Sequence, residues 1–244
     1  MRVAVDCFFD QLEDYPAGAT MVAVDVIRAA TTAVTAVAGG RRCFVVPDLD
    51  DAARQAQSLP NPFLVGELGG NMPFGFDGTN SPVAVSQLGD PERPLVLLST
   101  SGTRLMTSIA QATDAAYVAC LRNWRAQAAA ILRDAPEEVV LLGAGTRGEF
   151  REEDQVCCAW VAGELIAAGA DANAQTLDLV ARWEGMPVSE IAKGKSAAYL
   201  RGSGQLHDLE FVLTHVDDIH HAYVVRGNEI LEESAPATAP SRGG

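Results

Sequence analysis

The sequence has 244 residues, of which 48% are hydrophobic and 20% are charged, and this is enough apolar material to bury a full core. With 32 acidic and 18 basic residues, its net charge of −14 disfavours binding to nucleic acid or an anionic membrane, and an anionic ligand would need a local site built from arginine, helix N-termini or a metal ion. The five cysteines form no CxxC pair, which predicts reduced thiols. The N-terminus has no signal-peptide core, and no apolar run approaches about 20 residues. These features predict a soluble cytoplasmic protein.

Short β-rich runs alternate with alanine-rich stretches along the first 185 residues. Strands are predicted over residues 3–5, 21–26, 43–46, 63–65, 95–99, 116–120 and 139–142. Helices are predicted over residues 30–38, 50–58, 103–112, 123–133, 153–168 and 173–183. Apolar runs without interruption, as at 95–98 and 139–142, are typical of a sheet covered on both faces. The pattern therefore predicts an α/β fold with three layers, α/β/α.

The pattern weakens after residue 185. Short helices are predicted over residues 189–192, 197–200 and 206–214, and a last strand over 222–225. Residues 232–244 are rich in Pro, Ala, Ser and Gly and are predicted to be disordered. Since no linker divides the remainder, residues 1–231 are predicted to form one domain, with two closely packed lobes as the alternative.

Three strands run into polar loops and then into helices, at residues 22–32, 95–105 and 139–150. In an open α/β sheet, the loops at the carboxyl ends of the strands line the crevice where ligands bind. We therefore expect these three loops to meet at one site.

The first of these loops places Asp25 and Arg28 directly after a hydrophobic strand. Buried charge is costly unless it is paired or bound to a metal ion, so Asp25 needs a partner. An ion pair with Arg28 would be sufficient. The functional alternative makes Asp25 a metal ligand or proton-transfer group and Arg28 a clamp on two phosphate oxygens.

The longest irregular stretch covers residues 66–82 and contains five glycines and two prolines, which exclude a helix or a central strand. Loops of this length are usually functional or disordered, and its phenylalanines argue against disorder. It carries Glu67, Asp77, Asn80 and Ser81. Capping of turns within the loop is the alternative role for Asp77 and Asn80.

The second strand-end loop has the sequence STSGT at residues 99–103. Its glycine permits a tight turn, while hydroxyl groups and free N–H groups at the start of the next helix would face an anion such as phosphate. An ordinary Ser or Thr helix cap explains the same residues equally well.

The third loop, residues 143–148, matches the GxGxxG dinucleotide pattern. The acids that follow it, among them Glu153 and Asp154, would crowd a pyrophosphate unless a cation lay between them. Acids in the first turn of a helix also complement its dipole. Because the loop also carries Arg147, a Mg²⁺ ion bridging the carboxylates and an anion is the favoured interpretation, with Asp154 as the better ligand candidate.

Taken in chain order, the motifs DVIRAATT (25–32), GELGG (66–70), GFDGTNSP (75–82), STSGT (99–103) and GTRGEFREED (145–154) resemble the motif set of the 2-phosphosulfolactate phosphatases. The resemblance extends over residues 3 to about 225. It implies a three-layer α/β fold and a Mg²⁺-dependent phosphatase that releases sulfolactate on the route to coenzyme M.

The same resemblance places the family's residues on this chain. They fall on Asp25, Arg28, Glu67, Phe76, Asp77, Asn80, Ser81, Pro82, Thr100, Gly102, Thr103, Glu153 and Asp154. The chain departs from the pattern at Ala30, where Thr or Ser is common, at Leu68, where Arg is expected, and at 78–79, where Leu-Gly is usual. The missing cation at position 68 weakens the expectation of sulfolactate selectivity more than that of phosphate binding.

These interpretations predict in-line displacement at phosphorus by water, because no DxDxT motif supplies a carboxylate nucleophile. The predicted catalytic residues are Asp25, Arg28, Asp77 and Asp154, and the predicted Mg²⁺ ligands are Asp25, Glu67, Asp77 and Asp154. The predicted substrate-binding residues are Arg28, Thr31, Asn80, Ser81, Thr100, Ser101, Gly102, Thr103, Gly145 and Arg147.

The predicted partner is a small anionic phosphate ester, and the alanine-rich helices are compatible with a homo-oligomer. Two alternatives remain at this point. One is a dinucleotide-dependent oxidoreductase that uses the glycine loop at 143–148, and the other is a non-catalytic protein that binds a phosphorylated metabolite.

Overall fold

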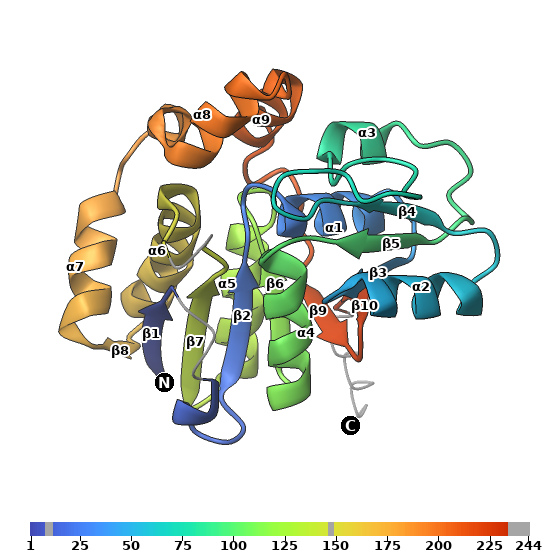
Figure 1. Cartoon of the computed structure of the whole chain (residues 1–244). Coiled ribbons are helices and arrows are strands. Elements are labelled where there is room, and N and C mark those ends of the chain that lie inside the picture. Colours follow the sequence, from blue (N-terminus) through green and yellow to red (C-terminus); the bar gives the residue numbers. More distant parts are fainter. Residues whose placement is uncertain (8–11, 146–148, 234–244) are drawn as a thin grey trace, which may run out of the picture.

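The computed structural model describes residues 1–7, 12–145 and 149–233, which are built around one ten-stranded sheet (Figure 1). Its strand order is β4-β5-β3-β10-β9-β6-β2-β7-β1-β8. The strands are β1 (Arg2–Asp6), β2 (Thr20–Val24), β3 (Cys43–Val46), β4 (Phe63–Gly66), β5 (Leu95–Leu98), β6 (Ala116–Ala119), β7 (Glu138–Gly143), β8 (Asp171–Ala172), β9 (Tyr223–Arg226) and β10 (Glu229–Glu232).

The sheet consists of two parallel parts. Strands β4, β5 and β3 are parallel to one another, and so are β6, β2, β7, β1 and β8. The hairpin β9–β10 joins the two parts through antiparallel pairs with β6 and β3. The carboxyl ends of β2 and β7 in one part, and of β4 and β5 in the other, run into loops that line the same cavity.

Helices cover both faces of the sheet. The longer ones are α1 (Ala29–Ala38), α2 (Leu49–Ser58), α4 (Gly102–Ala112), α5 (Trp124–Asp134), α6 (Glu152–Ala167) and α7 (Ala174–Trp183). Alternate residues of β2 show the two faces, because Met21 and Ala23 pack with α1 and α4 whereas Val22 and Val24 pack with α5 and α6. Ala52 of α2 packs against the remaining face of β3 and β5. The three-layer α/β/α prediction is confirmed.

A group of short elements covers the carboxyl ends of the strands (Figure 1). It contains α3 (Pro82–Ser86), the 3-10 helix η2 (Val188–Lys193), α8 (Lys195–Gly202) and α9 (Leu206–Thr214). A small cluster of Ala197, Leu200 and Leu209 holds α8 and α9 together. A further short 3-10 helix, η1, covers Leu12–Asp14.

The structure corrects several predicted boundaries. Strand β2 ends at Val24, two residues earlier than predicted, so that Asp25 lies in the loop rather than in the strand. The short elements β8, β10 and α3 were not predicted, because runs of two to five residues carry little periodicity. Strand β10 extends to Glu232, the first residue of the predicted tail, and residues 234–244 lie outside the described residues.

None of the helices in the described part of the chain combines the length and the apolar character that crossing a membrane requires.

Candidate active site

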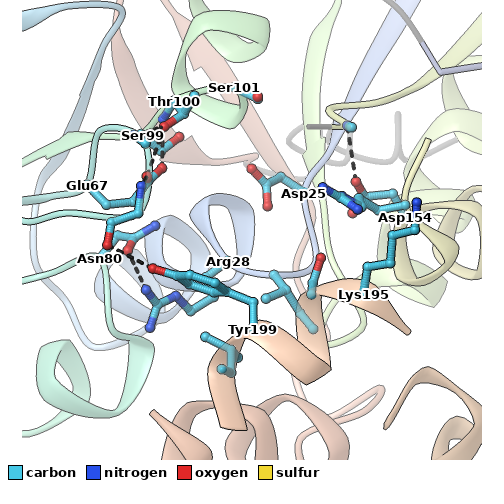
Figure 2. A pocket seen from close by; sticks show the side chains of 17 residues that line it. Asp25, Arg28, Glu67, Asn80, Ser99, Thr100, Ser101, Asp154, Lys195 and Tyr199 are labelled. Atoms are coloured by element: carbon cyan, nitrogen blue, oxygen red, sulfur yellow. Dashed lines mark hydrogen bonds between the residues drawn. The ribbon is translucent and has the colours of Figure 1, made fainter. Parts of the chain in front are cut away.

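A cavity of about 220 Å³ lies where the strand-end loops meet beneath α8. Eight of the predicted site residues line it: Asp25, Arg28, Glu67, Asn80, Thr100, Ser101, Gly145 and Asp154. Figure 2 shows Glu67 and Thr100 on one side of this space, Asp154 and Lys195 on the other, and Asp25 between them. The cavity is smaller than the roughly 300–1,000 Å³ typical of drug-sized ligands, so it suits a small metabolite.

Two buried carboxylates, Asp25 and Asp154, come from different strand ends. Oδ1 of Asp25 accepts a hydrogen bond from the N–H of Ala29 at 3.1 Å, which places it at the start of α1. Asp154 lies in the first turn of α6 and accepts from the N–H groups of Val26 at 2.8 Å and Gly145 at 3.3 Å. The Asp154 side chain therefore ties the β7–α6 loop to the loop that carries Asp25.

Burial and mutual repulsion both disfavour the charged forms of these acids. Desolvation, with further contributions from the charges of Glu67 and Glu153, raises the pKa of Asp25 to about 7. Desolvation and the charges of Asp25 and Glu153 hold the pKa of Asp154 well above its usual range. The pKa of Glu153 is also raised by burial, although Ser196 and Arg151 oppose this. Neither oxygen of Glu153 has a hydrogen-bond partner among the described residues.

This cluster predicts a specific dependence of stability on pH. A carboxyl group whose pKa is raised by folding stabilises the folded state fully below its unfolded pKa, near 4, and this stabilisation is lost as the pH rises through the folded value. The metal-free protein should therefore have a lower melting temperature at pH 8 than at pH 5. Asp25→Asn removes the group that titrates near 7 and should make this difference several degrees smaller, as differential scanning calorimetry in EDTA would measure. An equal difference in both proteins would contradict the assignment.

Gly102 does not line the cavity, but it allows Asp25 its position. A Cβ atom at residue 102 would lie 1.9 Å from Oδ2 of Asp25 and 2.8 Å from the Cβ of Ala29. Glycine is therefore the residue that lets α4 begin against this carboxylate.

Gly102→Ala should displace the Asp25 carboxylate and lower kcat about 100-fold, since a shift of 1 Å in a catalytic group has effects of that size. Steady-state kinetics would measure the change. Gly89→Ala is the matched control, because a Cβ there meets no atom within 4 Å. Turnover by Gly102→Ala that equals turnover by the control would show that the position of Asp25 is unimportant.

Glu67 organises the opposite wall of the cavity. Its carboxylate accepts hydrogen bonds from the N–H of Thr100 at 2.7 Å, from the Thr100 hydroxyl at 2.8 Å and from the N–H of Gly70 at 2.8 Å. These bonds join the loop after β4 to the loop after β5. Ser101, the N-cap of α4, makes no capping hydrogen bond with its side chain and also lines the cavity. We therefore interpret Glu67 as the residue that orders this wall, and Ser101 as the one that offers a hydroxyl to a ligand.

Arg28 is held by two residues from distant parts of the chain. Its guanidinium forms an ion pair with the fully buried carboxylate of Asp208 in α9, and its Nη2 donates to Oδ1 of Asn80 at 2.9 Å. Ser81 donates to the same aspartate at 2.5 Å. Since a guanidinium has five N–H donors, these contacts fix Arg28 and leave donors for an anion in the cavity.

Asp77 does not reach the cavity. Its exposed side chain accepts a hydrogen bond from the N–H of Leu64 at 2.9 Å, and its own N–H donates to the Leu64 carbonyl at 2.8 Å. The two bonds attach the long loop to β4. This is the capping role given above as the alternative, and it separates Asp77 from the carboxylates around Asp25.

Three other predicted ligand contacts are used within the protein. The hydroxyls of Thr31 and Thr103 donate to carbonyl oxygens of their own loops, at 2.7 and 3.1 Å, and Ser81 bonds to Asp208. None of the three lines the cavity, so they support the strand-end loops rather than face a ligand. Arg147 lies outside the described residues.

Several residues of the site were not predicted from the sequence. Arg151, Lys195, Ser196 and Tyr199 line the cavity, and Asp208 pairs with Arg28 beneath it. Most of these lie after residue 185, where periodicity is weak. The sequence holds no clear signal for Asp208, because α9 also carries His207 and Glu210 and the arginine partner of Asp208 lies 180 residues away.

The glycine loop at 143–148 does not continue directly into a helix. Helix α6 begins at Glu152, and its first turn carries Glu152, Glu153 and Asp154. A dinucleotide fold needs the positive end of a helix directly after the glycines, so this geometry does not favour the oxidoreductase alternative.

The carboxylates of the cavity can be judged against the ligands that Mg²⁺ requires. Among the described residues, no three His, Cys, Asp or Glu side chains are grouped so that they could hold a metal ion. Mg²⁺ is commonly bound by only one or two carboxylates and completes its coordination with water and substrate phosphate. Asp25 and Asp154 fit that requirement, because both are buried oxygen donors and burial outweighs the interactions that favour their charged forms.

Comparison with known proteins supports one family throughout. A family model described as 2-phosphosulpholactate phosphatase matches residues 9–225. A protein of Synechococcus sp. (strain WH7803) is 34% identical over 197 residues, which cover 78% of this chain and 79% of the relative. One from Deinococcus radiodurans is 32% identical over 215 residues, covering 86% and 88%. Both relatives are named "Probable 2-phosphosulfolactate phosphatase". The chain therefore belongs to the 2-phosphosulfolactate phosphatase family.

Proposed function

We propose that this protein is a Mg²⁺-dependent phosphatase that hydrolyses a small phosphate monoester, 2-phosphosulfolactate or a related phospho-hydroxy acid. The observation that carries the proposal is the meeting of Asp25 and Asp154 with Arg28 and the loop at 99–101 around one small cavity. Family membership supports the reaction class, and the names of the relatives support the substrate.

The chain's own residues divide the task between binding and charge stabilisation. Arg28, fixed by Asp208 and Asn80, would bind non-bridging phosphate oxygens and stabilise the charge that develops on them. Ser101 lies on the wall of the same cavity, and its hydroxyl would orient the phosphoryl group, while the Thr100 hydroxyl stays bonded to Glu67. Because Asp208 and Asn80 already hold Arg28, its guanidinium needs little reorganisation in the transition state.

Asp25 and Asp154 are the residues proposed to hold Mg²⁺. The ion would polarise the phosphoryl oxygens and lower the pKa of bound water. Burial raises the pKa of both acids in the metal-free protein, so their charged forms depend on a bound cation.

Release of inorganic phosphate tests the proposal. Phosphate should appear when the protein is incubated with 2-phosphosulfolactate and Mg²⁺, stop in EDTA and resume when Mg²⁺ is restored. Binding of the ester without release would favour the non-catalytic alternative. Phosphate release that is insensitive to EDTA would support the phosphatase activity and exclude a requirement for Mg²⁺.

A further inference from the structure

Two further cationic side chains, Arg151 and Lys195, line the cavity, and Figure 2 shows Lys195 on the side opposite Glu67 and Thr100. Arg151 precedes α6 as its N-cap, and Lys195 is the first residue of α8. Their side chains converge on one oxygen, Oε2 of Glu149, at 3.4 Å from Nη1 of Arg151 and 2.6 Å from Nζ of Lys195. Glu149 itself does not line the cavity. The Glu149 carboxylate, which lies outside the cavity, thus contacts two cations of the cavity wall.

This small cluster has unused capacity for an anion. The Arg151 side chain is only 15% exposed, and its buried Nε has no hydrogen-bond partner among the described residues. Lys195 is exposed, and Glu149 is the partner that its ammonium group contacts. Glu153 also interacts with the charge of Arg151, but neither of its oxygens hydrogen-bonds to Arg151 or to any other described residue. A buried donor without an acceptor costs free energy, which an anionic ligand group would recover.

The position of this cluster separates it from the proposed phosphate site. Arg28 lies with Asn80 on the side of Glu67 and Thr100, while Lys195 lies beside Asp154 on the other side (Figure 2). The two cationic ends therefore face one cavity with Asp25 between them. A ligand with a single anionic group could use only one end, whereas a ligand with two could use both.

We propose that Arg151 and Lys195 form a second anion subsite, which binds a carboxylate or sulfonate group of the phosphate ester in place of Glu149. This inference rests on the proposed phosphatase function. It makes Arg151 and Lys195 specificity-determining residues, which favour esters with a second negative charge over esters with an uncharged remainder. It also makes Glu149 a competitor for the substrate, because the Glu149 carboxylate and the ligand group claim the same two cations.

Three esters that share a branched three-carbon core separate the possible sources of the second charge. Isopropyl phosphate carries only the phosphate, 2-phospholactate adds a carboxylate, and 2-phosphosulfolactate adds a sulfonate as well. With the full chain and Mg²⁺, Lys195→Gln should raise KM for the charged esters about 10-fold, and Lys195→Gln combined with Arg151→Gln about 100-fold. The value of kcat/KM for isopropyl phosphate should stay within about twofold of wild type. If only 2-phosphosulfolactate is affected, the bound group is the sulfonate, and if both charged esters are affected, it is the carboxylate.

Glu149→Gln provides a test with the opposite sign. Removing the competing carboxylate should lower KM for the charged esters severalfold and leave isopropyl phosphate unchanged. Lys193→Gln is the matched control for Lys195→Gln, since Lys193 is an exposed lysine two residues away that pairs only with Glu190 and does not line the cavity. It should behave as wild type with all three esters.

Two results would overturn the subsite. One is an equal loss of kcat/KM for isopropyl phosphate and for the charged esters in Lys195→Gln. The other is a higher KM for the charged esters in Glu149→Gln. Failure of the wild-type protein to release phosphate from any ester would instead reject the proposed function. In that case calorimetric titration of the wild type and Lys195→Gln with 2-phospholactate and 2-phosphosulfolactate would still test the subsite, and equal affinities for both esters in the two proteins would reject it.

Discussion

Replacing Asp25 or Asp154 by asparagine should lower kcat for phosphate release about 1,000-fold while the protein stays folded. Asparagine keeps one oxygen, which can accept the hydrogen bond from Ala29 in Asp25→Asn and from Val26 in Asp154→Asn. In Asp154→Asn only the longer bond from Gly145, at 3.3 Å, is lost. What is lost is the negative charge that would hold Mg²⁺. Steady-state kinetics at several Mg²⁺ concentrations, with circular dichroism as the check on folding, would measure the effect.

Asp77→Asn is the matched control for these two variants. Asp77 has the same side chain as Asp25 and Asp154. It bonds to the backbone of Leu64 outside the cavity. It should retain wild-type turnover. If Asp25→Asn and Asp154→Asn keep turnover as well, the carboxylates are not part of the chemistry. If Asp77→Asn alone is inactive, the location of the metal site is contradicted.

Removing Asp208 should give the largest loss of stability among the site variants. Asp208→Ala leaves the Arg28 guanidinium buried without its counter-charge, and breaking a buried pair in this way typically costs about 3–5 kcal/mol. The same variant frees Arg28 from the orientation that the pair imposes, so KM for the phosphate ester should rise. Urea unfolding and steady-state kinetics would measure the two effects.

A double-mutant cycle separates the pair from the individual side chains. Arg28→Ala together with Asp208→Ala should cost less stability than the sum of the single changes, because no buried charge is left unpaired. The exposed pair of Arg54 and Asp51 is the control and should show a coupling of no more than about 0.5 kcal/mol. Additive losses for Arg28 and Asp208 would mean that their contact does not contribute to stability.

Much of the fold follows from local sequence patterns. The strands β3 and β5 and the helix α4 were predicted within one residue at each end, because apolar runs and helical spacing are local properties. The hairpin partner β10 was missed because its sequence, EILE, is four residues long and does not alternate apolar and polar residues. Its role in joining the two parallel parts of the sheet depends on pairs with β3 and β9 that no local pattern contains.

The candidate site was predictable where a strand end carries it. Asp25 directly follows β2, and Ser101 lies three residues after the end of β5. The rule that ligands bind at the carboxyl ends of strands was therefore enough to place both. Lys195 and Tyr199 reach the cavity from α8, which packs over the strand ends only through tertiary contacts. Asp77 was predicted to be a site residue but caps a turn instead. Its sequence context would be the same in either role.

The central claim is that Asp25 and Asp154 bind a divalent cation beside a phosphate site formed by Arg28 and the loop at 99–101. A crystal of the protein soaked with Mn²⁺ and inorganic phosphate tests it most directly, because anomalous scattering identifies the metal. The account predicts an anomalous peak coordinated by Asp25 and Asp154, with phosphate oxygens contacting both the ion and Arg28. Metal density at another place in the structure, with this cavity holding phosphate alone or nothing, would contradict it.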